Sequence, residues 1–239
     1  MCFSPEADFT AAAVVGVVGV ATLRLVREPR ALLIAALPLL FALHQFVEGF
    51  VWLGLRGDMS SGLGDAARDV YVVYAHAALP VIVPLGLYLI EPSARHRRRM
   101  LPFVVLGAVL GLYLLWQLTA FPIHAEARAH CISYATHTAL GIPSAIAYVV
   151  VTCGPALLSS RRYLRWFGVA NLVGVGITVA LRQAEFTSVW CVYAALVSFL
   201  IYEHFRRERR RDAASPALAA VTSSGGRWRA RRSRRTAAG

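Results

Sequence analysis

Three polar side chains interrupt an otherwise apolar stretch between Pro38 and Leu55. They are His44, Gln45 and Glu48, in the sequence PLLFALHQFVEGFVWLGL. Residues three and four apart share one face of a helix, so these side chains are expected to lie together. A carboxylate at the centre of a bilayer costs about 2.5–3.5 kcal/mol on insertion scales, so Glu48 needs a proton, a partner or water. This chemistry suits binding, proton transfer or catalysis, and the structural alternative is a polar clasp that fixes helix packing.

The histidine spacing gives no support for a metal site. No two histidines are three or four apart and HExxH is absent, so no helix offers the two-histidine face of many zinc enzymes. The chain also has no lysine, which excludes retinal or pyridoxal phosphate held through a Schiff base. We therefore expect no metal and no cofactor.

The composition places these residues in a membrane protein. Of 239 residues, 57% are hydrophobic and only 16% are charged, whereas a soluble domain has about 25% charged residues. A helix needs about 20 apolar residues to cross the hydrocarbon core. We predict an all-α bundle of seven transmembrane helices in residues 1–205, with spans at about 9–26, 31–55, 70–90, 101–121, 137–158, 164–181 and 187–204.

The arginines predict the orientation of these spans. Arg56, Arg68, Arg128 and Arg182 fall on one side of the membrane, and the other 21 of the 25 arginines fall on the opposite side. Cytoplasmic loops carry the excess of arginine. The N-terminus is therefore expected outside and the C-terminus in the cytoplasm. No cleavable signal peptide is evident, and we expect a multi-pass protein of a bacterial inner (plasma) membrane.

Several polar side chains collect on the predicted outer side with Glu48. An outward-opening pocket is therefore expected there, and the alternative is an ordinary wet interface with an aromatic belt. The pocket candidates besides the three residues above are His76, His130, His137, Arg182 and Trp190.

Three of the four cysteines also lie on the predicted outer side, where the compartment permits disulfides. Cys131 and Cys191 are the expected pair, which would tie the loop after the fourth span to the start of the seventh. Cys2 could replace either one. Cys153 is expected to be a free packing thiol inside the fifth span.

Residues 206–239 form an Arg-rich C-terminal tail. They are polar and lack a periodic apolar face, so we expect disorder. Their excess of arginine favours binding to anionic lipid headgroups of the bilayer. Nucleic-acid binding is the alternative, but no fold or aromatic interleaving beyond Trp228 supports it, so we expect no nucleic acid partner.

Three motifs resemble a known family. They are the opening Met-Cys-Phe-Ser, the run PLLF-x-x-HQ-x-x-EG-x-x-W at 38–52 and the run SVWC-x-x-AA-x-x-S at 188–198. Together they resemble an uncharacterised family of bacterial polytopic membrane proteins, known only as a domain of unknown function. Members often carry Gln at the position of His44, so the resemblance implies a smaller role for His44 than for Gln45 or Glu48. It implies no substrate, cofactor or reaction.

Two functions follow from these observations. The first is a binding, sensing or transport module with an outward-opening polar pocket around Glu48. The second is a membrane-embedded hydrolase-type enzyme that uses Glu48 and outer-side histidines. The absence of paired histidines, of a GxSxG serine and of HExxH favours the first. The sequence does not indicate which small molecule would bind.

Overall fold

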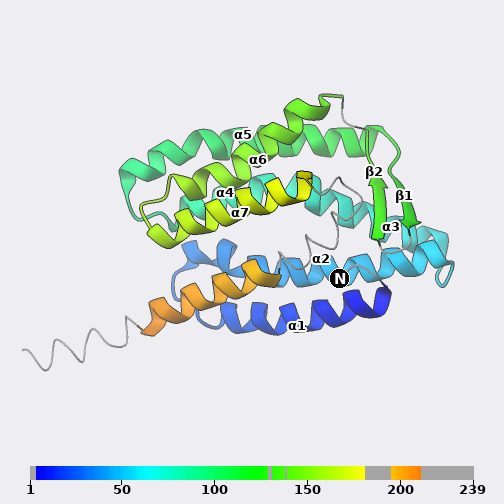
Figure 1. The fold of residues 1–239 in the computed structure, drawn as a ribbon, viewed down its shortest axis with the longest axis horizontal. Coiled ribbons are helices and arrows are strands. Elements are labelled where there is room, and N and C mark those ends of the chain that lie inside the picture. Colours follow the sequence, from blue (N-terminus) through cyan, green and yellow to red (C-terminus); the bar gives the residue numbers. More distant parts are fainter. Residues whose placement is uncertain (1–3, 129–130, 138, 181–194, 211–239) are drawn as a thin grey trace, which may run out of the picture.

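The computed structural model describes residues 4–128, 131–137, 139–180 and 195–210. Long helices run side by side along one axis of the molecule and form a bundle (Figure 1). The helices are α1 (Pro5–Leu23), η1 (Pro29–Ala31), α2 (Leu32–Arg56), α3 (Ser61–Val73), η2 (Tyr74–Ala78), α4 (Leu79–Ile90), α5 (Ala94–Ala120), α6 (Gly141–Leu157) and α7 (Arg162–Ala180), followed by helical residues 195–210.

The first two helices form a tight antiparallel hairpin. Ser4 caps α1 by accepting a hydrogen bond from the backbone of Ala7 at 3.3 Å. A Cβ atom added at Gly19 would lie 2.6 Å from the backbone nitrogen of Leu39, so the two helix backbones are almost in contact. This close packing fixes the register of the pair, and it places the start of α1 beside the second half of α2.

The third helical unit is longer than the sequence indicated. It begins at Ser61 rather than near residue 70 and continues through α3, η2 and α4 to Ile90. The element η2 is a single π-helical turn, which widens the helix and changes which carbonyl groups are bonded within it. The hydroxyl of Tyr148 in α6 donates to the carbonyl of Ala75 in this turn at 2.7 Å. The irregular turn is thus stabilised from a neighbouring helix.

A β-hairpin replaces the loop expected after the fourth span, so the described part of the chain is not entirely helical. Strands β1 (His124–Arg128) and β2 (Cys131–Ala135) pair antiparallel and cover one end of the bundle (Figure 1). Alternate side chains of a strand share a face. The side chain of Ile132 lies on the face that points toward the helices, and it is buried in a small core. That core consists of Val51, Trp52, Tyr71, Val72, Ile123 and Ile132. We call this end of the bundle the hairpin end.

The opposite end carries most of the basic side chains of the described residues, and we call it the arginine end. It contains the connections from α1 to α2, from α4 to α5 and from α6 to α7, and the end of the helix at 195–210. That helix continues past residue 206, where the tail was expected to begin, and residues 211–239 lie outside the described part of the chain.

Four helical units are long and apolar enough to cross a membrane, which indicates a membrane protein. They are Pro5–Leu23, Pro29–Arg56, Ser61–Ile90 and Ala94–Ala120. The fifth expected span corresponds to α6, an apolar helix of 17 residues, and the sixth to α7. The seventh overlaps the helix at 195–210, and its residues 187–194 lie outside the described residues. The seven-span count and the orientation stay predictions.

Candidate functional site

The side-chain amide of Gln45 joins two buried carboxyl groups. Its Nε2 atom donates to Oδ1 of Asp8 in α1 and to Oε2 of Glu48 in α2, the second at 3.1 Å. One amide nitrogen carries two hydrogens, so it can serve both acceptors at once. Asp8 and Glu48 are each 0% exposed. Two acidic side chains from different apolar helices therefore share one donor.

Asp8 is the member of this site that sequence analysis missed. It lies in the first turns of α1, where an acidic residue is common because it complements the helix dipole. A useful signal was nevertheless present. In an antiparallel hairpin, residues equally far from the turn lie beside each other, and Asp8 and Glu48 are nearly equidistant from Pro29. The packing of α1 on α2 then brings the two carboxyl groups to Gln45.

The pair of acids is electrostatically unusual. Neighbouring carboxylates repel each other when both are ionised, and burial in an apolar helix pair strengthens that repulsion. Oδ2 of Asp8 has no hydrogen-bond partner among the described residues, although it is buried. A buried acceptor in this state favours the binding of a proton or another donor.

His44 points into an aromatic stack rather than toward α1. Its ring lies on Tyr71 with centroids 3.9 Å apart and planes 11° apart, and Tyr71 in turn stacks on Tyr134 of β2 at 4.8 Å. The ring of Tyr74 is tilted against the His44 ring, with centroids 4.8 Å apart. The polar face of α2 is therefore divided. Gln45 donates to Glu48 and to Asp8 of α1, whereas His44 links α2 to α3 and to the hairpin end.

The other predicted pocket residues do not all join this site. His76 lies midway along the Ser61–Ile90 unit, in the π turn, with Nδ1 3.1 Å from the carbonyl oxygen of Val72. His137 is exposed and packs against Phe121 at the surface of the hairpin end, with ring centroids 4.3 Å apart. The remaining three candidates, His130, Arg182 and Trp190, lie outside the described residues.

The predicted disulfide also stays a prediction. Cys131 lies half-buried at the start of β2, but Cys191 and the alternative partner Cys2 are outside the described residues. Cys153 is a buried thiol in α6. Within residues 4–128, 131–137, 139–180 and 195–210, no group of three His, Cys, Asp or Glu side chains could hold a metal ion.

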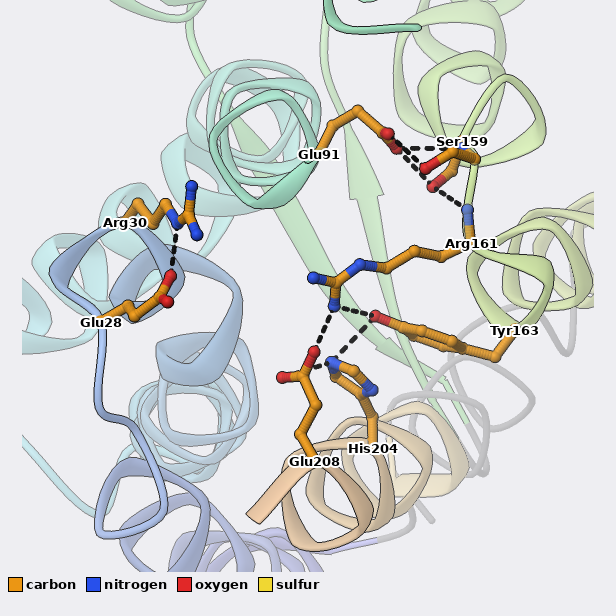
Figure 2. A network of polar contacts seen from close by, with 9 residues as sticks. Glu28, Arg30, Glu91, Ser159, Arg161, Tyr163, His204 and Glu208 are labelled. Atoms are coloured by element: carbon orange, nitrogen blue, oxygen red, sulfur yellow. Dashed lines mark hydrogen bonds and ion pairs between the residues drawn. The ribbon is translucent and has the colours of Figure 1, made fainter. Parts of the chain in front are cut away.

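A third buried carboxylate, Glu91, was not indicated by the sequence because it follows an apolar run directly. It accepts hydrogen bonds from the Ser159 hydroxyl at 2.7 Å, from the Ser160 backbone at 3.0 Å and from the Ser93 backbone at 3.1 Å. Burial raises the pKa of Glu91, but the hydrogen bonds from Ser160 and Ser159 outweigh it and hold this pKa below its usual value. Glu91 is thus a fully bonded link between α4 and the α6–α7 turn (Figure 2).

A polar network continues from that turn to the last described helix. Arg161 donates to Glu208 and, at 3.2 Å, to the hydroxyl of Tyr163, and His204 lies 3.3 Å from the Glu208 carboxylate (Figure 2). Tyr163 stacks on His204 with ring centroids 4.1 Å apart. The hydrogen bond from His204 and the charge of Arg161 lower the pKa of Glu208 to about 2. This network joins α7 to residues 195–210.

The comparisons with known proteins identify a family but no activity. The sequence model of a family of unknown function (DUF6629) matches residues 1–217, which include every helix described above and both polar clusters. The comparisons with curated proteins and with solved structures gave no match. Because the match extends over most of the 239 residues, the chain belongs to the family of unknown function DUF6629.

Proposed function

We propose that this protein is a proton-linked binding or transport module of a bacterial inner membrane, with Asp8, Gln45 and Glu48 as its proton-binding centre. The observation that carries this proposal is the bridge from one amide to two fully buried carboxyl groups on two helices that are apolar enough to span a bilayer. Ionisable groups inside membrane helices commonly mark proton relays and substrate pathways.

The chemistry of the pair favours a shared proton. Two carboxyl groups this close release their protons in two coupled steps, because the second negative charge forms beside the first. The state with one proton keeps a single charge, which the Gln45 amide stabilises. Loss of that proton adds a charge between α1 and α2, so protonation is coupled to how tightly these helices pack.

The surroundings support access from one side. The arginine distribution favours an outer location for the hairpin end, and the pocket would open there. The stack of His44, Tyr71 and Tyr134 connects α2 to the β-hairpin. The proposal includes seven membrane spans with the N-terminus outside. The Arg-rich residues from 206 onward would contact anionic lipid headgroups on the cytoplasmic side.

Proton flux into vesicles tests the proposal. The purified protein is reconstituted into lipid vesicles, a pH gradient is applied, and the internal pH is followed with a trapped dye. The wild-type protein is expected to dissipate the gradient faster than empty vesicles, and Glu48→Gln and Asp8→Asn are expected to lose this activity. Glu126→Gln and Asp58→Asn are matched controls, because they make the same changes at exposed positions.

The alternative, in which the polar residues only fix helix packing, predicts a different result. If the two acids only fix the helix hairpin, wild-type vesicles behave like empty ones, and the two buried-site variants differ from the wild type only in thermal stability. That outcome would contradict the transport proposal.

A further inference from the structure

The arginine end of the molecule contains a cavity of about 200 Å³ between the α1–α2 connection, the end of α4, the α6–α7 turn and the helix at 195–210. It is separate from the Asp8–Glu48 site, which lies in the half of α2 nearer the hairpin end. The charged residues that line it are Arg27, Glu28, Arg30, Arg161, Glu208 and Arg209.

The charge of this lining is positive. Four arginines face two carboxylates there, which leaves an excess of two positive charges when His204 is neutral. Arg30 is paired with Glu28, and Arg161 shares Glu208 with His204. The low pKa of Glu208 shows that these partners hold its charge in place. These ion pairs orient Arg30 and Arg161, and the lining as a whole stays positive because it has four guanidinium groups and two carboxylates.

The arginines approach the cavity from different elements. Figure 2 shows Arg30 and Arg161 on opposite sides of one space, with Glu208 and His204 beside it. Arg209 is fixed by a hydrogen bond of 2.9 Å to the backbone oxygen of Arg24, which ties the last helix to the α1–α2 connection. Planar guanidinium groups that converge from several sides match the tetrahedral oxygens of a phosphate, because each can donate two parallel hydrogen bonds.

Apart from His204, the rest of the lining is apolar. Leu25, Ala31, Ile90 and Phe205 complete the cavity wall, at the ends of helices whose outer surfaces are rich in exposed apolar side chains. A free phosphate ion gains nothing from such a wall. A phospholipid does, since its glycerol and acyl groups continue from the phosphate toward the bilayer core. Basic pockets at the cytoplasmic ends of membrane helices are known to bind anionic lipid headgroups.

We propose that this cavity binds a phosphate group through Arg27, Arg30, Arg161 and Arg209, and that the headgroup of an anionic phospholipid supplies it. The bound lipid would join the α1–α2 connection to the α6–α7 turn and to residues 195–210. It would therefore stabilise the packing of the last helix on the first two. Neither the Arg-rich residues beyond 210 nor the buried acids are needed for this site.

Native mass spectrometry of the detergent-purified full-length protein tests the proposal. Phosphatidylglycerol, phosphatidylcholine and inorganic phosphate are each titrated against the wild type, against Arg27→Gln/Arg30→Gln and against Arg98→Gln/Arg99→Gln. The last variant is a matched control, because Arg98 and Arg99 are exposed arginines at the same end and do not line the cavity. Both double variants remove two positive charges and keep all of the C-terminal arginines.

We expect one tightly retained phosphatidylglycerol per wild-type chain and much weaker retention of phosphatidylcholine. The apparent affinity for phosphatidylglycerol should fall about tenfold in Arg27→Gln/Arg30→Gln and stay unchanged in the control. A different result is that inorganic phosphate binds through the same two arginines and no lipid is retained. This result would support the phosphate site, overturn the lipid as its ligand and assign the site to a soluble phosphate compound. An equal loss of phosphatidylglycerol affinity in both double variants, or no loss in either, would overturn the proposal. Any lipid binding would then be due to surface charge in general.

A thermal melt accompanies each titration. If Arg27→Gln/Arg30→Gln does not fold, Arg30→Gln alone replaces it, because this side chain is 52% exposed and its loss leaves no buried group unpaired. The single variant is expected to weaken phosphatidylglycerol binding severalfold, and unchanged binding would contradict the site.

Discussion

The carboxyl groups of Asp8 and Glu48 meet at a single amide, that of Gln45, although they belong to two antiparallel helices. Both are buried, and both helices are apolar enough to cross a bilayer. Such a pair of acids must be stabilised by a proton or another cation. The desolvation free energy of two buried carboxylates is larger than the stabilisation that hydrogen bonds from one amide can supply.

Removal of the bridging amide is expected to destabilise the helix hairpin in a way that depends on Asp8. Gln45→Leu removes the donor that the two buried carboxyl groups share, and the loss of such a buried hydrogen bond costs about 1–3 kcal/mol. The same substitution should cost less in an Asp8→Asn background, since the new amide of residue 8 can donate to Glu48. Thermal melts of the two single variants and the double variant measure this coupling. Strictly additive losses would contradict a direct interaction among the three side chains.

The register of α1 on α2 depends on Gly19. Gly19→Ala places a methyl group 2.6 Å from the backbone nitrogen of Leu39, so the helices must separate or shift. We expect a loss of about 1–3 kcal/mol in the free energy of unfolding. Gly16→Ala is the matched control on the same helix, because its new methyl group meets the Cβ of Ala42 at an ordinary 3.7 Å.

If Gly16→Ala and Gly19→Ala lowered the melting temperature equally, the close contact at Gly19 would not be what sets the register. A selective effect of Gly19→Ala should also alter proton binding at the Asp8–Glu48 pair, since that pair depends on the same register.

The membrane class, the first four apolar helices and the polar face of Gln45 and Glu48 could be predicted from the sequence. Long apolar runs, and charged residues within them, can be recognised from the order of residues alone. Asp8 could not be predicted, because it looks like an ordinary first-turn acid until α1 and α2 are paired. The strands at 124–128 and 131–135 were missed because two short polar segments carry little periodic signal.

The network at the arginine end could not be predicted for a related reason. Glu91 and Ser159, or Arg161 and Glu208, are far apart in the sequence and meet only when α4, α7 and the helix at 195–210 pack together. In the sequence, the excess of arginine on one side indicates the orientation of the helices in the membrane. The structure adds that four of these arginines surround a cavity.

Acid should weaken the packing of the last described helix through Glu208. Its pKa is lowered from the ordinary value of 4.5 to about 2 in the folded protein. A lowered pKa contributes stability that is fully present above about pH 4.5 and is lost as the pH falls toward 2, because the folded state then has to take up the proton it resists. The melting temperature of the wild type should therefore fall between pH 5 and pH 3 by more than that of Glu208→Gln.

Glu126→Gln serves as the control for this acid effect, since Glu126 is exposed on β1 and has no such network. It should follow the wild-type pH dependence. The same slope in wild type and Glu208→Gln would show that the ion pair with Arg161 contributes nothing to stability.

Infrared spectroscopy of the protein in lipid nanodiscs tests the central claim most directly. A shared proton on the Asp8–Glu48 pair predicts a carbonyl stretch of a protonated carboxylic acid at neutral pH. This band should shift in deuterated water, disappear in folded Glu48→Gln and Asp8→Asn, and persist in Glu126→Gln. The absence of this band in the wild type at neutral pH, or its survival in both buried-site variants, would contradict a proton-binding centre at Asp8, Gln45 and Glu48.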